Sequence, residues 1–375
     1  MKTRTFLAAR CCVVVLGCLT ALGCLSTLGC DDANYDPPTL IKTMRVLAVR
    51  ADPPYIGLAP TRVSAFVVGQ TPGETLCYAW ALCPFAWEED GNYACLDPSL
   101  QVDLGNAPTA NANLLALLTV LEKLPAVLAA KGLQPPKDVA VDGATDKPSD
   151  VAVDAGFEVR LLFQISEARI WGGTCPNDTT KMLAKPCPTR DGCMFGDKGL
   201  RVVVPNDKGA PSKDVHANPR LELLTLNGVP WPADVTPTVA VYKAPPADDL
   251  TQLNTTQGLE VRPVWSPGSI ELISKSTEAG VPDTTERLIF SFFSDAGTFQ
   301  YRRTGFQVPD NGYQAERPAK KAATQLVTLW VVVRDGRGGS DWTTRQLLVD
   351  PTTPAGRHPL CGDDPSLPKC DEVGP

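Results

Sequence analysis

Short runs of apolar and β-branched residues, separated by Pro and Gly turns, recur along most of this 375-residue chain. In the first half they cover residues 44–50, 62–68, 76–83, 157–165, 200–204 and 219–226. In the second half they cover residues 238–243, 259–265, 270–274, 287–293, 326–334 and 343–349. Runs of this length and spacing are typical of all-β sandwiches. The pattern therefore predicts a mainly β fold with two sandwich domains, residues 43–230 and 231–350.

Two segments interrupt the β pattern in the first domain. Residues 112–131 are rich in Leu and Ala on nearly all faces, which predicts a buried helical insertion that is kinked or divided at Pro125. Residues 171–198 are rich in Cys, Gly and Pro and are expected to form a long loop. Between them the sequence DVAVD occurs at 138–142 and again at 150–154, which we interpret as a surface loop.

The N-terminus has the layout of a secretory signal. Lys2, Arg4 and Arg10 precede an apolar stretch over residues 11–29, and the polar sequence DDANYDPP follows at 31–38. A transmembrane anchor is the alternative, because about 19 apolar residues nearly span a bilayer. The glycines and cysteines within the stretch, and its Gly-Cys end, favour a signal. We expect residues 1–29 to be removed and residues 30–42 to form a tether.

The end of this signal, Thr27-Leu28-Gly29-Cys30, resembles the lipobox of bacterial lipoproteins. The resemblance implies cleavage before Cys30 and acylation of its thiol by fatty acids such as palmitate, so the lipid bilayer becomes a partner. Cys24 offers a competing site, but cleavage there would leave apolar residues on the mature chain. Loss of residues 1–29 removes three positive and no negative charges, which changes the net charge from −7 to −10. Anchoring must then come from the lipid, on the outer membrane in preference to the inner, with the body periplasmic or surface-facing.

Eight cysteines besides Cys30 remain after signal removal, an even number that indicates disulfides in an exported chain. Cys361 and Cys370 stand apart and are expected to pair with each other. The other six admit 15 connectivities. We prefer Cys83–Cys95, Cys187–Cys193, and Cys77–Cys175 across the fold. Zinc is the rival, but the chain has no C-x-x-C spacing and no His beside these groups.

Two further features resemble immunoglobulin-like families. Trp80 lies in the third β-run, where immunoglobulin-like sandwiches carry a buried core Trp. The turn VRDGRGG at 333–339 resembles the last hairpin of bacterial immunoglobulin-like and PKD-like repeats. Together with the opening MRVLAVRADPP, it is similar to two-domain exported lipoproteins of Gram-negative bacteria. The resemblance implies a fold and says little about function.

Candidate chemistry is sparse. The chain has only two His, His216 and His358, and lacks the common hydrolase, zinc-protease and phosphate-loop motifs. This favours a non-enzymatic protein without a cofactor; a hydrolase using paired carboxylates is the weakest alternative. Asp335, Asp341 and Asp310 are weak calcium candidates, against the interpretation that Asp335–Asp341 form a Gly-rich hairpin turn.

The expected role is a structural or protein-docking module of the cell envelope. The alternative is a carbohydrate- or peptidoglycan-binding module that uses loop aromatics, for which the candidates are Trp87, Trp171, Trp231 and Trp342. The net charge of −7 argues against a nucleic-acid partner, because phosphate binding requires a basic face.

Overall fold

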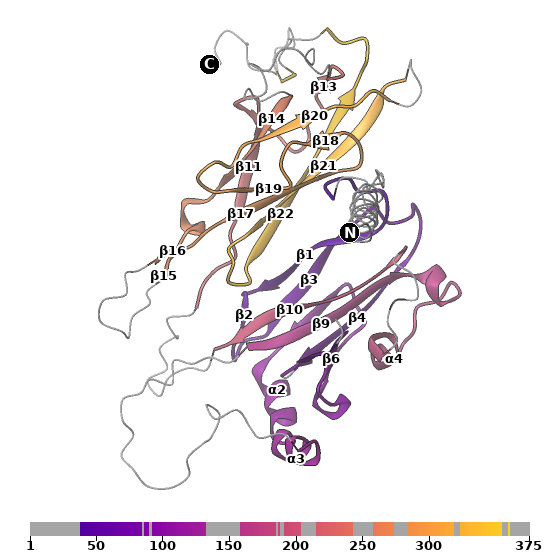
Figure 1. Ribbon diagram of the computed structural model, residues 1–375, viewed down its shortest axis with the longest axis vertical. Coiled ribbons are helices and arrows are strands. Elements are labelled where there is room, and N and C mark those ends of the chain that lie inside the picture. Colours follow the sequence, from indigo (N-terminus) through magenta and orange to yellow (C-terminus); the bar gives the residue numbers. More distant parts are fainter. Residues whose placement is uncertain are drawn as a thin grey trace, which may run out of the picture. The chain divides into compact units, whose positions relative to one another are not determined.

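Four larger β-sheets, packed in two pairs, form most of the described part of the chain, and two separate two-stranded hairpins accompany them (Figure 1). The computed structural model describes residues 38–84, 86–89, 92–132, 158–184, 187, 191–203, 215–242, 258–273, 284–318, 323–354 and 359–360. Residues 39–375 belong to one compact unit. The fold is mainly β and consists of two sandwiches, the first with a helical insertion and Cys-rich loops, as the sequence predicts.

The first sandwich packs a three-stranded sheet on a five-stranded one. The smaller sheet has the order β1 (Arg45–Asp52), β3 (Thr61–Val68), β8 (Thr109–Ala112). The larger has the order β2 (Tyr55–Ile56), β10 (Cys193–Val202), β9 (Glu158–Glu167), β4 (Leu76–Cys83), β7 (Val102–Gly105). A separate hairpin joins β5 (Ala86–Glu89) to β6 (Asn92–Cys95).

Strand β4 is buried on both faces, which explains its near-continuous apolar sequence. Trp80 is fully buried in the main core between the two sheets, where its indole N–H donates to the Ala107 carbonyl at 2.8 Å. Cys77 and Ala79 point to the other face and pack against Met182 of α4 (Thr179–Ala184). The predicted core position of Trp80 is therefore confirmed.

The helical insertion forms two helices, α2 (Leu114–Leu121) and α3 (Leu124–Ala130), which lie at the end of the first sandwich (Figure 1). Asn113 caps α2 by accepting from the Ala116 N–H at 2.8 Å. The helix is interrupted before Pro125, which lies in the first turn of α3. At this position a proline's missing N–H does not remove a helical hydrogen bond. The predicted division of the helix is thus confirmed, but only one face of α2 is buried, since Leu115 and Leu118 are exposed. The described residues also include three single-turn helices, η1 (Pro98–Leu100), η3 (Ala168–Trp171) and η5 (Pro267–Ser269).

The second sandwich packs two five-stranded sheets around an aromatic-rich core. One sheet has the order β12 (Val229–Trp231), β11 (Leu221–Leu226), β14 (Leu259–Trp265), β20 (Asn311–Gln314), β18 (Thr298–Phe299). The other has the order β13 (Thr238–Val239), β22 (Ser340–Val349), β21 (Gln325–Arg334), β17 (Ile289–Ser294), β19 (Arg303–Gly305). A small hairpin pairs β15 (Leu272–Ile273) with β16 (Thr284–Thr285).

Several predicted boundaries need correction. The change of sandwich falls between Val202 and Leu221 and not at residue 230, because β11 pairs with β14 and buries Leu224 in the second core. The loop expected over 171–198 ends earlier, since β10 begins at Cys193 and pairs with β9.

The two ends of the described chain also differ from expectation. The tether was expected to reach residue 42, but Ile41 N donates to Ser294 O at 2.7 Å and Ser294 N to Thr39 O at 2.9 Å. The chain is therefore held against β17 before β1 begins. In the segment expected as a Pro-rich tail, 351–375, Leu360 is buried in the second core. The DVAVD repeats lie outside the described residues.

Candidate functional site

The free edge of β1 is covered by side chains from the second half of the chain. Carbonyls at alternate residues of this strand point away from β3. Leu47 O accepts from the Arg334 guanidinium, Val49 O from the Ser340 hydroxyl at 3.1 Å, and Ala51 O from the Asn218 amide at 2.7 Å. Exposed edges invite pairing with other chains. Here the edge is capped, and the caps join the two sandwiches.

An apolar cluster reinforces this contact. Trp330 and Val332 of β21 pack on the outer face of their sheet against Leu47, Ala48 and neighbouring residues of the first sandwich. Trp342 of β22 stacks on Phe66 of β3, with ring centroids 5.0 Å apart and an interplanar angle of 6°. Strand β21 is thus buried on both faces, since Val327, Leu329, Val331 and Val333 face the second core. We call this contact, made by β1 and β3 with β21, β22 and Asn218, the interface between the sandwiches.

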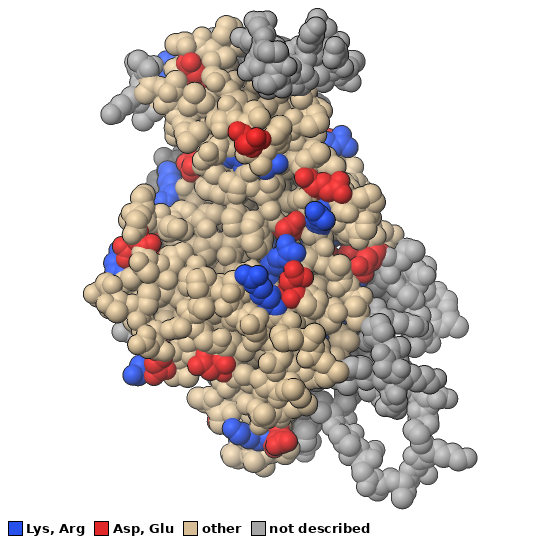
Figure 2. Space-filling view, turned by 180° about the vertical axis from the view of Figure 1, so that it is seen from behind, with Lys and Arg blue, Asp and Glu red and all other residues tan. Residues whose placement is uncertain are grey.

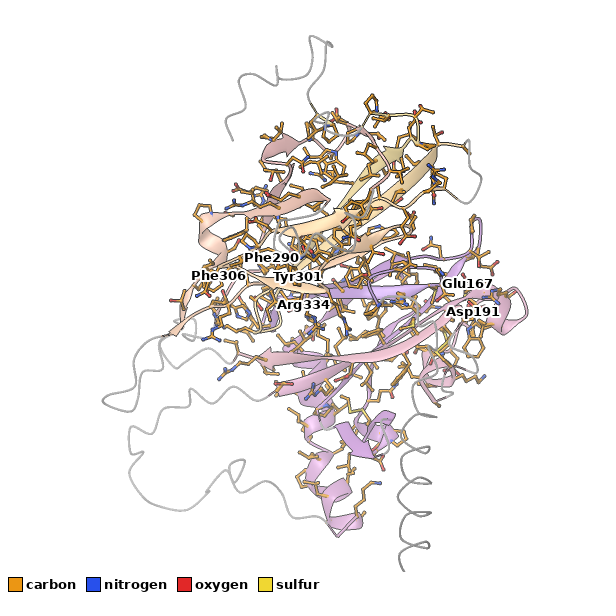
Figure 3. All side chains as sticks on the ribbon, turned by 45° about the horizontal axis from the view of Figure 1, so that its top comes forward. Glu167, Asp191, Phe290, Tyr301, Phe306 and Arg334 are labelled. Carbon is orange, nitrogen blue, oxygen red and sulfur yellow. A yellow bond between two sulfur atoms is a disulfide. The ribbon has the colours of Figure 1, made fainter. Side chains whose placement is uncertain are left out.

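Arg334 is the residue of β21 that donates across the interface, from the second sandwich to Leu47 O of the first (Figure 3). Its guanidinium also donates to the Ser291 hydroxyl at 3.2 Å. Burial, followed by the nearby charge of Arg303, lowers the pKa of Arg334 below its usual value. The guanidinium nevertheless stays charged at neutral pH, because arginine starts from a very high value.

Beside the interface, six ionisable residues from four segments form a charged cluster. They are Lys198 of β10, His216 of the connection before β11, Glu271 and Glu286 on either side of the β15–β16 hairpin, and Asp335 and Arg337 of the β21–β22 turn. Arg337 Nη1 lies 3.3 Å from Glu271 Oε2 and 3.5 Å from Glu286 Oε1. His216 Nε2 lies 3.9 Å from Asp335 Oδ2. The Lys198 ammonium donates to the Gly338 carbonyl of the same turn.

Two members of this cluster have pKa values shifted toward neutrality. Burial, and then the negative charge of Asp335, raises the pKa of Glu286 to about 7. Burial lowers the pKa of Lys198 to about 8, although Asp335 opposes this shift. Glu286 and Asp335 are only 2% and 3% exposed, so a substrate cannot reach their carboxylates. The cluster can take up and release protons, and it lacks the access that a carboxylate hydrolase needs.

The calcium candidates have protein partners. Asp335 Oδ1 accepts the N–H groups of Arg337 and Gly339 at 2.7 and 2.9 Å, and Gly339 leaves no room for a Cβ beside this carboxylate. Asp341 accepts from Arg50 Nη1 at 3.0 Å and from Leu221 N at 2.9 Å. Asp310 lies 3.4 Å from Arg262. Among the described residues, no three metal-ligating side chains converge. The geometry is that of a hairpin turn.

Excess Ca²⁺ or EDTA is therefore expected to leave the melting temperature unchanged, because too few carboxylates converge among the described residues, and Asp335 Oδ1 and both Asp341 oxygens already accept hydrogen bonds. Differential scanning calorimetry with and without each reagent measures this. A melting temperature that rises with Ca²⁺ and falls with EDTA would contradict the turn interpretation, since a ligand that binds the folded state stabilises it.

The aromatic candidates for sugar binding are packed into the protein where their side chains are described. Trp231 is fully buried, and its indole N–H donates to Val235 O at 2.9 Å. Trp342 is stacked on Phe66 within the interface. Trp171 is half-buried, and its N–H donates to the Ser166 hydroxyl at 2.7 Å. The side chain of Trp87 lies outside the described part. These three rings are explained by packing.

The six central cysteines pair as preferred from the sequence: Cys77–Cys175, Cys83–Cys95 and Cys187–Cys193. Cys24, Cys30, Cys361 and Cys370 lie outside the described residues. The bridges indicate folding in an oxidising compartment, extracellular or periplasmic. No helix in the described ranges is long and apolar enough to cross a membrane.

Ion pairs between side chains also hold the Cys-rich loop. Glu167 and Asp191 lie close together at one edge of the first sandwich (Figure 3), and Arg169 bridges them with contacts of 2.5 and 3.3 Å. Glu167 Oε1 accepts from Thr71 N at 2.7 Å. Burial alone would raise the pKa of Glu167, but the bonds from Thr71 and Arg169 outweigh it and lower the pKa. The carboxylate therefore stays ionised and fixes the loop.

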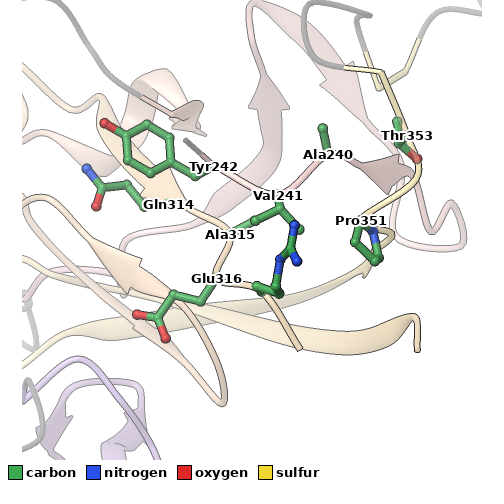
Figure 4. A pocket seen from close by; sticks show the side chains of 9 residues that line it. Ala240, Val241, Tyr242, Gln314, Ala315, Glu316, Pro351 and Thr353 are labelled. Carbon is green, nitrogen blue, oxygen red and sulfur yellow. The ribbon is translucent and has the colours of Figure 1, made fainter. Parts of the chain in front are cut away.

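Two hollows open on the surface. One, of about 530 Å³, lies beside the interface and is lined by Arg50, Asp52, His216, Arg220 and Asp341 with adjoining residues. Its acidic and basic side chains balance, and Arg50 is paired with Asp52 and Asp341. The other, of about 360 Å³, is in the second sandwich, with Tyr242 and Gln314 on one side and Pro351 and Thr353 on the other (Figure 4). On the face in Figure 2, acidic and basic side chains are interspersed.

Comparisons with known proteins add little. No family model matches this chain, and no curated protein matches it. A crystal structure of Drosophila N-cadherin EC1-4 is similar over 81% of this chain and 49% of its own length, with 9% identity and a TM-score of 0.18. The chain thus spans about half the length of that structure. A likeness at this TM-score supports no inference about function.

Sequence reasoning missed Lys198, Glu286 and Arg334. Lys198 and Glu286 occur in segments that it assigned to a loop or to a strand's flank. No local pattern distinguishes them from solvated charges, because their burial depends on segments far apart in the chain.

Proposed function

We propose that this chain is an exported bacterial lipoprotein, anchored through acylated Cys30, whose two sandwiches act as one rigid docking module for another protein of the cell envelope. The observation that carries the proposal is the interface between the sandwiches. Its edge caps, its apolar cluster and the burial of β21 on both faces suit a permanent contact better than a flexible linkage. A fixed pair of domains presents a surface of constant geometry.

The backbone contacts of residues 39–41, at the start of the described chain, support the same role. The lipobox-like signal ends at Cys30, and residues 39–41 pair with β17 of the second sandwich before β1 joins the first. A load applied to the lipid anchor therefore acts on both sandwiches together. The outer membrane is the favoured location, with the body facing the periplasm or the exterior.

Carbohydrate binding through loop aromatics gains no support from the described rings. Trp231 is fully buried, and Trp171 and Trp342 are engaged in packing. Sugar platforms require exposed aromatic faces. We therefore keep protein docking as the proposal.

Photo-crosslinking in intact membranes tests the proposal. Docking contacts are expected where large apolar side chains are exposed, and Leu115 of α2 and Val308 are 65% and 68% exposed. A photoreactive residue at either position is expected to capture one recurrent envelope protein, in an amount nearly equal to that of this protein. The same residue at Gln346, an exposed polar position on β22, is the matched control. Equal capture at all three positions, or capture of glycan alone, would overturn the docking role.

Cys30→Ala tests the anchor in the same cells. Without the thiol no acyl chain can be attached, so we expect the protein to leave the membrane fraction and to lose incorporated palmitate label. Retention of label in Cys30→Ala combined with its loss in Cys24→Ala would instead place the anchor at Cys24. Absence of palmitate label from the native chain would refute lipid anchoring.

A further inference from the structure

We propose that the interface between the sandwiches is pH-sensitive, and that Glu286 is the group whose protonation stabilises it. The proposal goes beyond docking and holds for the soluble body of the protein as well as for the anchored form. It starts from the position of the charged cluster, which lies where the β21–β22 turn contacts both sandwiches.

The turn couples the cluster to the interface. On one side, Arg337 lies within 3.3 and 3.5 Å of Glu271 and Glu286 of the second sandwich. On the other, Gly338 O holds Lys198 of the first sandwich, and Ser340 donates to Val49 O at 3.1 Å. Ser340 N also donates to Asn218 Oδ1 at 3.0 Å, and Asn218 in turn caps Ala51. A shift of this turn therefore disturbs two of the three caps on β1.

The charges explain why Glu286 is the sensitive group. The other members of the charged cluster are Lys198, His216, Glu271, Asp335 and Arg337. Arg334 is close enough for its charge to act on Lys198. With Glu286 protonated, Lys198 and Arg337 balance Asp335 and Glu271. Ionisation of Glu286 adds a third carboxylate at a site where its side chain is 2% exposed. Opening the turn would hydrate that carboxylate and separate it from Asp335, so ionisation favours the open state.

The sign of the pH dependence follows from the raised pKa of Glu286, about 7 in the folded protein against an ordinary 4.5. A group with a raised pKa stabilises the closed state fully below its unfolded value, and this stabilisation is lost as the pH rises through 7. Lys198 changes the stability of the interface in the opposite direction, because burial lowers its pKa to about 8. It loses its proton mainly above that pH, so it stays charged over most of the range tested. Acidification from pH 7.5 to 5.5 should therefore tighten the interface.

Hydrogen exchange of the full chain, lacking only the signal, tests this. After correction for intrinsic exchange rates, peptides covering 45–52 and 335–341 are expected to exchange about tenfold faster at pH 7.5 than at pH 5.5. Peptides covering β4 and β9 serve as the internal reference, since they belong to the first core. Glu286→Gln should abolish the pH dependence, because glutamine is neutral throughout. Glu222→Gln, the same change at an exposed position of β11, should leave it intact.

Two results would overturn the proposal. One is an interface whose exchange does not change between the two pH values in the native chain. The other is a Glu286→Gln variant that keeps the pH dependence, which would assign it to another group such as His216. If Glu286→Gln does not fold, as judged by β9 protection, Arg337→Gln replaces it. Loss of that cation should move the midpoint of the pH dependence upward, and an unmoved midpoint would refute the role of Glu286.

Discussion

Replacing both Cys77 and Cys175 with alanine is expected to lower the free energy of unfolding by about 4.7 kcal/mol. The two residues are 98 positions apart, so their bridge closes the longest loop of the three and removes the most entropy from the unfolded chain. The bridge also ties the outer face of β4 to the Cys-rich loop, where Cys77 packs against Ala168 and Met182. Urea unfolding followed by circular dichroism, under oxidising conditions, measures the change.

The Cys187–Cys193 bridge provides the matched control. It spans only 6 residues, and the same chain-entropy relation gives about 2.2 kcal/mol for its removal. The first double variant should therefore be the less stable by about 2.5 kcal/mol. Equal losses in the two double variants would show that loop length does not set the contribution of these bridges.

Trp231→Ala is expected to destabilise the second sandwich by about 3–5 kcal/mol, since a large buried ring is replaced by a cavity. Trp231 is fully buried in the second core, and its N–H would no longer donate to Val235 O. Because the ring is fully buried, it is not accessible to a sugar. The expected result is a loss of stability measured by urea unfolding.

Trp231→Phe separates packing from recognition. Phenylalanine keeps most of the buried aromatic area but not the hydrogen-bond donor, so the loss should be smaller than for alanine. A folded Trp231→Ala variant with native stability would contradict the burial of this residue. Loss of binding to cell-wall fragments at unchanged stability would restore the sugar-binding alternative.

The sequence predicted most of the long strands because each carries its own apolar run, whereas most of β10 (Cys193–Val202) was assigned to the Cys-rich loop. Leu76–Cys83 and Leu259–Trp265 form strands with the same bounds as their apolar runs. The helical insertion was also predictable, since Pro125 cannot continue a helix and marks its division. The preferred pairing of the six central cysteines was likewise found, although the spacing alone left other pairings open.

Short strands and long-range contacts were not predictable in this way. β18 and β19 have two and three residues, too few for a periodic pattern. β11 was placed in the wrong domain because a strand's sequence does not reveal which sheet it joins. The Asp335–Asp341 turn was read correctly as a hairpin, yet its contacts with Lys198 and Val49 depend on a first sandwich more than a hundred residues away.

The candidate site follows the same division. The sequence by itself determined the β class, the cysteine set and the Gly-rich turn, because each depends on residues close together in the chain. The tertiary structure alone decided the burial of Trp231, the caps on β1 and the environment of Glu286. Burial and electrostatic shifts are set by what surrounds a group in space. For Glu286, those surroundings come from the β21–β22 turn and from Glu271, and only folding brings them together.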